Sequence, residues 1–253
     1  MRYILLFILL PLCSFGQIIN VENKRLSADK EGFVGTFDLG LNLIKNTAQI
    51  LQFNNNVHLQ YSKENHTYLL LNDISFVQKE GEEDWLNKGY QHFRYIYQNK
   101  KLGFEGFIQH QYDKAQKIQF RMLMGVGTRW QLVKNDSLQF AMGFSSMNEY
   151  ENPVDADPFV QIRLSHYLSF AFQVNENISL STTNYYQPLL TNWSDYRMSS
   201  QTTLKLALNK QFEFKITGNV TFDSQPAEAV PLLNYHVINL SLIHISEPTR
   251  HHV

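Results

Sequence analysis

Apolar and polar residues alternate with a period of two along most of this chain. In residues 118–132, Phe120 and Met122 alternate with a second set that includes Arg121 and Arg129. Such alternation is typical of β-strands that present one apolar and one polar face. The period predicts twelve strands, at residues 33–43, 47–61, 67–77, 89–97, 102–112, 118–132, 138–148, 159–172, 178–186, 196–208, 212–222 and from about 235 onward.

The connections between these strands alternate in length. Short polar turns rich in Asn, Asp and Lys are predicted at residues 62–65, 99–100, 134–136, 175–177 and 209–211. The intervening loops are longer, at residues 78–88, 149–158, 188–194 and 224–231. An even number of long strands with short turns at one end is the layout of a bacterial outer-membrane barrel. The fold class predicted is therefore all-β, an antiparallel up-and-down β-barrel of about twelve strands.

Composition supports one β domain and excludes some partners. Hydrophobic residues make up 43% of the chain, with 18 Phe and 13 Tyr, so much apolar surface is available to face a core or lipid. The formal net charge is −1, and Lys and Arg are scattered along the chain. Nucleic acid is therefore not expected as a partner, because its binding depends on concentrated positive charge.

The first residues have the pattern of a signal peptide. Arg2 supplies a positive charge, residues 4–12 are almost wholly apolar, and Ser14 and Gly16 are small residues at a cleavage site. We expect residues 1–16 to be removed and the protein to reach the cell outer membrane. The single cysteine, Cys13, lies in this segment, so the mature chain would have no disulfide and no thiolate nucleophile.

Several phrases carry a family resemblance. They are GFVGT (32–36), QY (60–61), LLND (70–73), GYQHFRY (89–95), GVGTR (125–129) and YYQPL (185–189). In this order the chain resembles domain of unknown function family 481, the salt-induced outer-membrane protein group, particularly its Bacteroidetes-type members. The resemblance covers residues 20–239. It implies a β-barrel in the outer membrane and supplies no catalytic residues.

The end of the chain departs from this resemblance. The phrase LSLIHISEPTR at residues 240–250 matches, codon by codon, the translation of a common transposase-type sequencing adapter. We interpret residues 17–239 as the barrel domain and residues 240–253 as a non-native tail that truncates the last strand. A barrel with an incomplete last strand would insert poorly, because an open edge leaves backbone groups unpaired in lipid.

The polar faces of the predicted strands carry candidate lumen charges. These are Arg94, Glu105, Arg121, Arg129, Arg163, Arg197, Lys205, Glu213 and Lys215. They could form a pore whose field selects anions. They could instead form ion pairs that fill a narrow interior. We favour the second interpretation, because a barrel lumen is polar whatever the protein does.

No catalytic residue, cofactor or metal site is predicted. An outer-membrane phospholipase would need a His-x-Ser phrase, and the only such phrase here, at residues 244–246, belongs to the tail. His92, His110 and His166 each occur singly, without a spaced nucleophile and acid. An acidic loop formed by Glu149, Glu151, Asp155 and Asp157 could hold a surface Ca²⁺, although a solvated loop is the simpler interpretation.

The sequence thus predicts an outer-membrane barrel with a structural or envelope-stress role, or a narrow passage for small solutes. A phospholipase-like lipid-modifying enzyme and a soluble periplasmic β-barrel binding protein are the alternatives. Expected partners are outer-membrane lipid, lipopolysaccharide and the barrel-insertion machinery.

Overall fold

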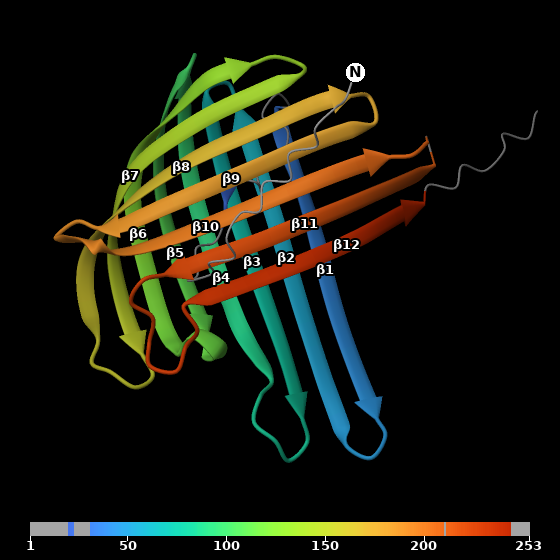
Figure 1. Ribbon diagram of the computed structural model, residues 1–253, viewed down its shortest axis with the longest axis vertical. Helices are drawn as coiled ribbons and strands as arrows, with labels where there is room; N and C mark the ends of the chain where they lie inside the picture. The colour runs from blue at the N-terminus through green and yellow to red at the C-terminus, as the bar shows by residue number, and fades with distance from the viewer. Residues whose placement is uncertain (1–19, 23–30, 210, 244–253) are drawn as a thin grey trace, which may run out of the picture.

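The computed structural model of the chain describes residues 20–22, 31–209 and 211–243 (Figure 1). The predicted signal peptide and Cys13 lie outside the described residues, as does the tail beyond Ile243. Among the described residues, no helix is long and apolar enough to cross a membrane. The strands are β1 (Gly32–Lys45), β2 (Gln49–Lys63), β3 (His66–Lys79), β4 (Leu86–Asn99), β5 (Leu102–Asp113), β6 (Ile118–Lys134), β7 (Leu138–Pro153), β8 (Phe159–Asn175), β9 (Ile178–Leu189), β10 (Asn192–Ala207), β11 (Phe212–Asp223) and β12 (Leu233–Ile243).

These twelve strands form one sheet in sequence order, and each strand pairs antiparallel with the next. The all-β, up-and-down architecture predicted from the period of two is therefore confirmed. The sheet curls strongly, so that β1 to β4 cross behind β9 to β12 (Figure 1). Residues of β3 to β5 and of β10 to β12 line one shared cavity. The inner face of the sheet thus encloses an interior.

The seam between β1 and β12 is open in the part of the chain that the structure describes. These two strands end the sheet, and no pairing between them is present among the described residues. Side chains on both faces of β1 are largely exposed, including Phe37 and Leu39 on one face and Asp38 on the other. The molecule is therefore a curled, barrel-like sheet with one unpaired edge on each side of the seam.

The two ends of the curled sheet carry different connections. One end, the short-turn end, has turns at residues 64–65, 100–101, 135–137, 176–177 and 208–211. The other, the long-turn end, has connections at residues 46–48, 80–85, 114–117, 154–158, 190–191 and 224–232, with a 3₁₀ helix at Lys114–Gln116. The predicted long loop at 188–194 was wrong, because β9 and β10 extend into it and leave a tight turn.

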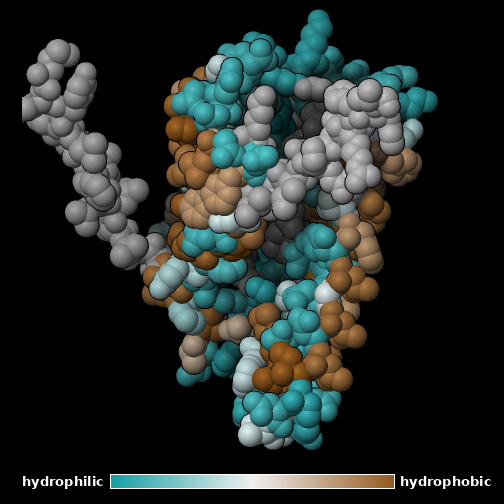
Figure 2. All heavy atoms as spheres, turned by 90° about the vertical axis from the view of Figure 1, so that its right-hand side faces the viewer, coloured by the Kyte–Doolittle hydropathy of each residue, from teal (hydrophilic) through white to brown (hydrophobic). Residues whose placement is uncertain are grey.

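Polarity is distributed inside out relative to a water-soluble protein. Large apolar side chains point outward from the sheet; Val126, for example, is 70% exposed. The buried residues are mostly polar or charged and include Arg163, Glu149 and Thr183. Figure 2 shows apolar residues along the flanks of the molecule and polar residues at both ends and in the recess between the flanks.

Aromatic rings gather on the outer face near both ends of the strands. Near the short-turn end, neighbouring rings of Phe33, Tyr61, Tyr68 and Tyr95 contact one another from β1 to β4. Near the long-turn end, the contacting rings are His110, Phe120 and Tyr150 on β5 to β7 and Tyr186, Tyr196 and Phe222 on β9 to β11. Two such belts are characteristic of barrels that span a bilayer.

One polar row interrupts the apolar outer face on β2 to β5. The Nδ2 of Asn72 donates to Oδ1 of Asn55, and the Nε2 of Gln91 donates to Oδ1 of Asn72 at 2.9 Å. The row continues to His110, whose Nδ1 lies 2.6 Å from Oε1 of Gln91. Because these side chains bond to one another, part of their hydrogen-bonding capacity is met without water.

Candidate functional site

The interior contains a network of buried ion pairs close to the long-turn end. We call it the interior network, and it consists of Arg121 on β6, Glu149 and Glu151 on β7, Arg163 on β8, Asp195 and Arg197 on β10, and Asp223 on β11. Alternation along each strand places these positions on the inner face. Each charged group is thus held where the sheet curls around it.

Glu149 is the centre of the interior network. Its side chain is fully buried, and its carboxylate contacts three arginines. Nε of Arg121 lies 3.1 Å from Oε1, Nε of Arg163 lies 3.1 Å from Oε2, and Nη1 of Arg197 also contacts Oε1. Gln161 donates a further hydrogen bond of 2.8 Å to Oε2. Multiple charged donors on one buried carboxylate compensate for the water that it has lost.

The interior network crosses the lumen. Arg197 on β10 reaches Glu149 and Glu151 on β7, although β8 and β9 lie between these strands in the sheet. Nε of Arg197 is also 2.8 Å from Oδ2 of Asp223 on β11. Arg163 joins the same strands, since its Nη1 lies 3.0 Å from Oδ1 of Asp195. These contacts fill the interior between β6 and β11 near the long-turn end.

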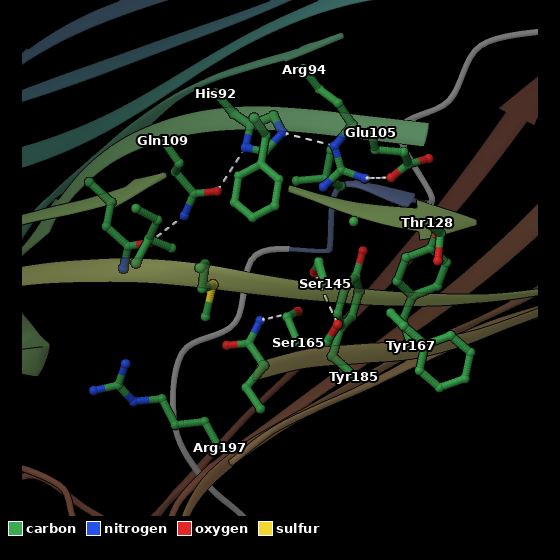
Figure 3. A pocket seen from close by; sticks show the side chains of 18 of the residues that line it. His92, Arg94, Glu105, Gln109, Thr128, Ser145, Ser165, Tyr167, Tyr185 and Arg197 are labelled. Carbon is green, nitrogen blue, oxygen red and sulfur yellow. Dashed lines mark hydrogen bonds and ion pairs between the residues drawn. The ribbon is translucent and has the colours of Figure 1, made fainter. Parts of the chain in front are cut away.

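A second group lies on the inner face of β4 and β5. Nη1 of Arg94 lies 3.0 Å from Oε2 of Glu105, and both side chains are buried. Nε of Arg94 donates to Nε2 of His92 at 3.3 Å, so Nδ1 of His92 is left to donate to Oε1 of Gln109 at 2.9 Å. Figure 3 shows these contacts beside a small cavity of about 40 Å³, to which Tyr167, Tyr185 and Arg197 also contribute.

The third group is the most exposed. Nζ of Lys205 on β10 lies 2.8 Å from Oε2 of Glu213 on β11, and the Lys205 side chain is about half exposed. Lys215 is opposite Lys205 in the register of the two strands. These residues lie near the short-turn end.

The structure places all nine predicted lumen charges on the inner face. Eight of them belong to the three groups above, and the ninth, Arg129, forms an ion pair with Glu22. Sequence reasoning missed the acidic partners Glu22, Glu149, Glu151, Asp195 and Asp223. The predicted lumen was therefore too basic. With its carboxylates included, the interior is close to charge balance.

The candidate calcium loop is not a cluster. Because β7 continues to Pro153, Glu149 and Glu151 lie on the inner face and contact arginines, whereas Asp155 lies in the exposed connection and contacts Lys117. Within the described ranges, no group of three His, Cys, Asp or Glu side chains could hold a metal ion. Of the single histidines, His92 faces inward, while His110 and His166 alternate onto the outer face.

A larger cavity of about 650 Å³ opens toward the long-turn end. Its lining comes from both sides of the curled sheet, with Asp73, Tyr90 and Gln111 on β3 to β5 and Ser199 and Asn219 on β10 and β11. Most of the lining residues carry a hydroxyl, amide or carboxylate group, and apolar parts of Leu86, Tyr90 and Tyr112 line it as well. The cavity could admit water or a small polar solute.

Residues 20–22, which precede the sheet, also lie in the interior. Val21 is buried against Leu69 and Leu71 on β3. The Glu22 carboxylate contacts Nε of Arg129 at 2.8 Å, and its backbone N–H donates to the Tyr185 hydroxyl at 3.2 Å. The periodic pattern of the strands gave no signal for this segment.

Three comparisons place the chain among known proteins. A family model described as "Protein of unknown function, DUF481" matches residues 37–231. No curated protein matches the chain. Among solved structures, the chain is similar to a NanC porin structure in a rhombohedral crystal form, with 7% sequence identity and a TM-score of 0.48, over 83% of this chain and 100% of that chain.

Proposed function

The chain belongs to the DUF481 family of proteins of unknown function, and from this premise we propose that it is an outer-membrane β-barrel with a closed lumen and a structural role. The membership confirms the resemblance carried by phrases such as GYQHFRY. Its proposed surroundings are outer-membrane lipid and lipopolysaccharide, reached with the help of the barrel-insertion machinery.

The inside-out polarity carries the proposal of a membrane location. Val126 on β6 and Leu168 on β8 point away from the sheet, whereas Arg163 and Glu149 are almost fully buried inside it. A soluble barrel would bury its apolar side chains and expose its charged ones, because each Å² of apolar surface left in water forgoes roughly 25 cal/mol of burial energy. The aromatic belts at both ends of the strands support the same location.

The interior network supports a closed lumen. Ion pairs from β7 to β10 occupy the space that a passage near the long-turn end would need. The carboxylates around Arg121, Arg163 and Arg197 cancel most of the local positive field, so anion selection has little support. We therefore prefer a structural role to transport and to lipid hydrolysis, for which the described interior offers no assembled nucleophile and base.

Location and closure can be tested separately. Cell fractionation of the protein with its native residues beyond Asn239 restored, with gel migration compared before and after heating, tests the membrane barrel. A soluble periplasmic product would overturn it. Planar-bilayer recording tests closure, and we expect no steady conductance. The matched variant Glu149→Ala removes the centre of the interior network, and we expect it to conduct if it folds. Steady conductance by the unsubstituted protein would contradict the closed lumen.

A narrow passage is the second candidate, favoured by the 650 Å³ cavity. Its polar lining, including Gln111, Ser199 and Asn219, would suit a small solute that enters from the long-turn end. Liposome swelling with small neutral and charged solutes distinguishes the candidates, because a passage gives solute-dependent swelling and a closed barrel gives none.

We also propose that residues 240–253 are not native. Register with β11 places Leu240 opposite Lys215 on the inner face and Ser241 opposite Phe214 on the outer face, which reverses the polarity of the other strands. The reversal begins before the tail, since the same register places Ile238 on the inner face opposite Thr217 and Asn239 on the outer face opposite Ile216. The adapter interpretation therefore rests on the codon-by-codon match of residues 240–250. Resequencing the gene beyond the codon for Asn239 tests this proposal. A gene that does encode LSLIHISEPTR at this position would refute it.

A further inference from the structure

The segment Asn20 to Glu22 rests on a docking site inside the curled sheet. One side of the site is apolar, since Val21 is 2% exposed and packs with Leu69 and Leu71 of β3, next to Tyr90 of β4. Burial of an apolar side chain of this size away from water is favourable. The apolar contacts therefore favour a seated segment.

The other side of the docking site is polar and comes from β6 and β9. Nε of Arg129 holds the Glu22 carboxylate at 2.8 Å; the Glu22 side chain is buried and the Arg129 side chain is 12% exposed. Nη1 of Arg129 also donates to Oε1 of Gln131 at 2.7 Å, which fixes the guanidinium. The Tyr185 hydroxyl accepts the Glu22 backbone N–H. The site thus matches an apolar side chain followed by a carboxylate.

The segment also lies between the two cavities. Asn20 lines the 650 Å³ cavity, whereas Val21 lines the cavity of about 40 Å³. Both cavities are lined in addition by Gln111. Removal of the segment would join these spaces and expose Arg129 to whatever enters.

We propose that residues 20–22 form a tethered plug, seated in this internal docking site and held mainly by the Glu22–Arg129 ion pair. The inference rests on the proposed closed barrel and deepens it, because it names a part of the chain that closes the lumen. When the plug withdraws, the site presents Arg129 and the Tyr185 hydroxyl to a carboxylate-bearing solute.

Cysteine labelling of the full chain, folded in detergent, tests the seated segment. In a Cys13→Ser background, Val21→Cys puts a near-isosteric thiol in the docking site, and Ser137→Cys puts one in an exposed turn. We expect a bulky polyethylene-glycol maleimide to label position 21 at least tenfold more slowly than position 137. Equal rates in a chain that shows heat-modifiable migration would overturn the plug.

Substitutions of the ion pair test what holds the plug. In the Val21→Cys chain, Arg129→Ala and Glu22→Gln are each expected to raise the labelling rate several-fold. Arg163→Ala is the matched control, because it removes another buried arginine, one that pairs with Glu149 and Asp195 and lines neither cavity. Equal acceleration of labelling by all three substitutions would indicate general loosening of the barrel and would overturn the specific role of Arg129. Glu22→Gln leaves Arg129 in place and removes only the charge of its partner. If Glu22→Gln does not accelerate labelling, the ion pair does not hold the plug.

The outcomes separate this inference from the proposed function. A chain recovered from the outer membrane with a freely labelled position 21 would refute the plug and leave the barrel standing. A soluble chain with a protected position 21 would refute the membrane location and leave the plug standing. In planar bilayers, conductance by Glu22→Gln without conductance by the unsubstituted chain would support the plug and the membrane location, and it would show that the interior network alone does not close the lumen.

Discussion

At the scale of single residues, Glu149 is the position on which the interior depends most. Its carboxylate contacts Arg121, Arg163 and Arg197, so one side chain compensates several buried positive charges. Removing one member of a buried ion pair leaves its partner uncompensated, which usually destabilises more than the pair itself stabilises.

We therefore predict that Glu149→Gln lowers the free energy of unfolding by about 3–5 kcal/mol. Gln keeps the volume and some hydrogen bonds but removes the charge that faces the arginines. The control is Asp155→Asn, which breaks the exposed pair with Lys117 and should change stability by about 0–1 kcal/mol. Guanidinium unfolding in detergent measures both, and equal midpoints for the two variants would contradict the prediction.

Glycines on the inner face set the distance between side chains and backbone. A Cβ added at Gly143 on β7 would lie 2.0 Å from the ring of Tyr167 on β8, closer than any real contact. At Gly218, which lies on the outer face of β11, an added Cβ meets nothing within 4 Å. The same substitution therefore has different consequences at the two positions.

Gly143→Ala is expected to destabilise the protein by about 1–3 kcal/mol, since the Tyr167 ring must move in a packed interior. Gly218→Ala should be neutral or slightly stabilising. The stability of both variants is measured as the temperature at which their gel migration shifts. Tyr167→Ala in the Gly143→Ala chain should recover part of the loss, and the absence of any recovery would mean that the ring is not the obstacle.

At the scale of elements, each strand separates residues on the outer face of the sheet from residues on its inner face. Val126 lies at mid-strand on the outer face of β6, whereas Asn219 of β11 borders the 650 Å³ cavity. In the proposed membrane barrel, a charge on the outer face would enter hydrocarbon, but a charge beside the cavity can stay hydrated.

Val126→Arg is accordingly predicted to reduce stability in lipid by about 2–4 kcal/mol, and Asn219→Arg by much less. Refolding into phosphatidylcholine vesicles, followed by urea titration, measures the difference. A larger loss for Asn219→Arg than for Val126→Arg would mean that the outer and inner faces have been exchanged.

Strand ends explain most of the acidic residues that sequence reasoning missed. The predicted strand at 138–148 stops just before Glu149, the one at 196–208 starts after Asp195, and the one at 212–222 stops before Asp223. A polar residue near a turn has the same local pattern whether it faces solvent or the lumen. Only the pairing of neighbouring strands extends β7, β10 and β11 to include these residues.

At the scale of the whole molecule, the open seam is the main departure from a closed barrel. The outer edge of β1 has no neighbouring strand among the described residues, and neither has that of β12. By contrast, β6 lies between β5 and β7 along its length. Amide groups that lack a partner strand are expected to exchange with solvent more readily.

Hydrogen exchange of the full chain in detergent should therefore show faster exchange in Gly32–Lys45 than in Ile118–Lys134. We expect at least a tenfold difference in median rate, because β1 is hydrogen-bonded on one side only. Equal protection of the two peptides would show that β1 has a second neighbour in solution, and the open seam would have to be abandoned.

The sequence by itself determined the all-β fold, the number of strands and the inner or outer face of Arg121 and Val126. These follow from local alternation, because each side chain of a strand points opposite to its neighbour. The tertiary structure alone decided that Arg197 meets Glu149 and that Glu22 meets Arg129. Contacts between segments so distant along the chain depend on how the sheet curls, and no local pattern encodes that curvature.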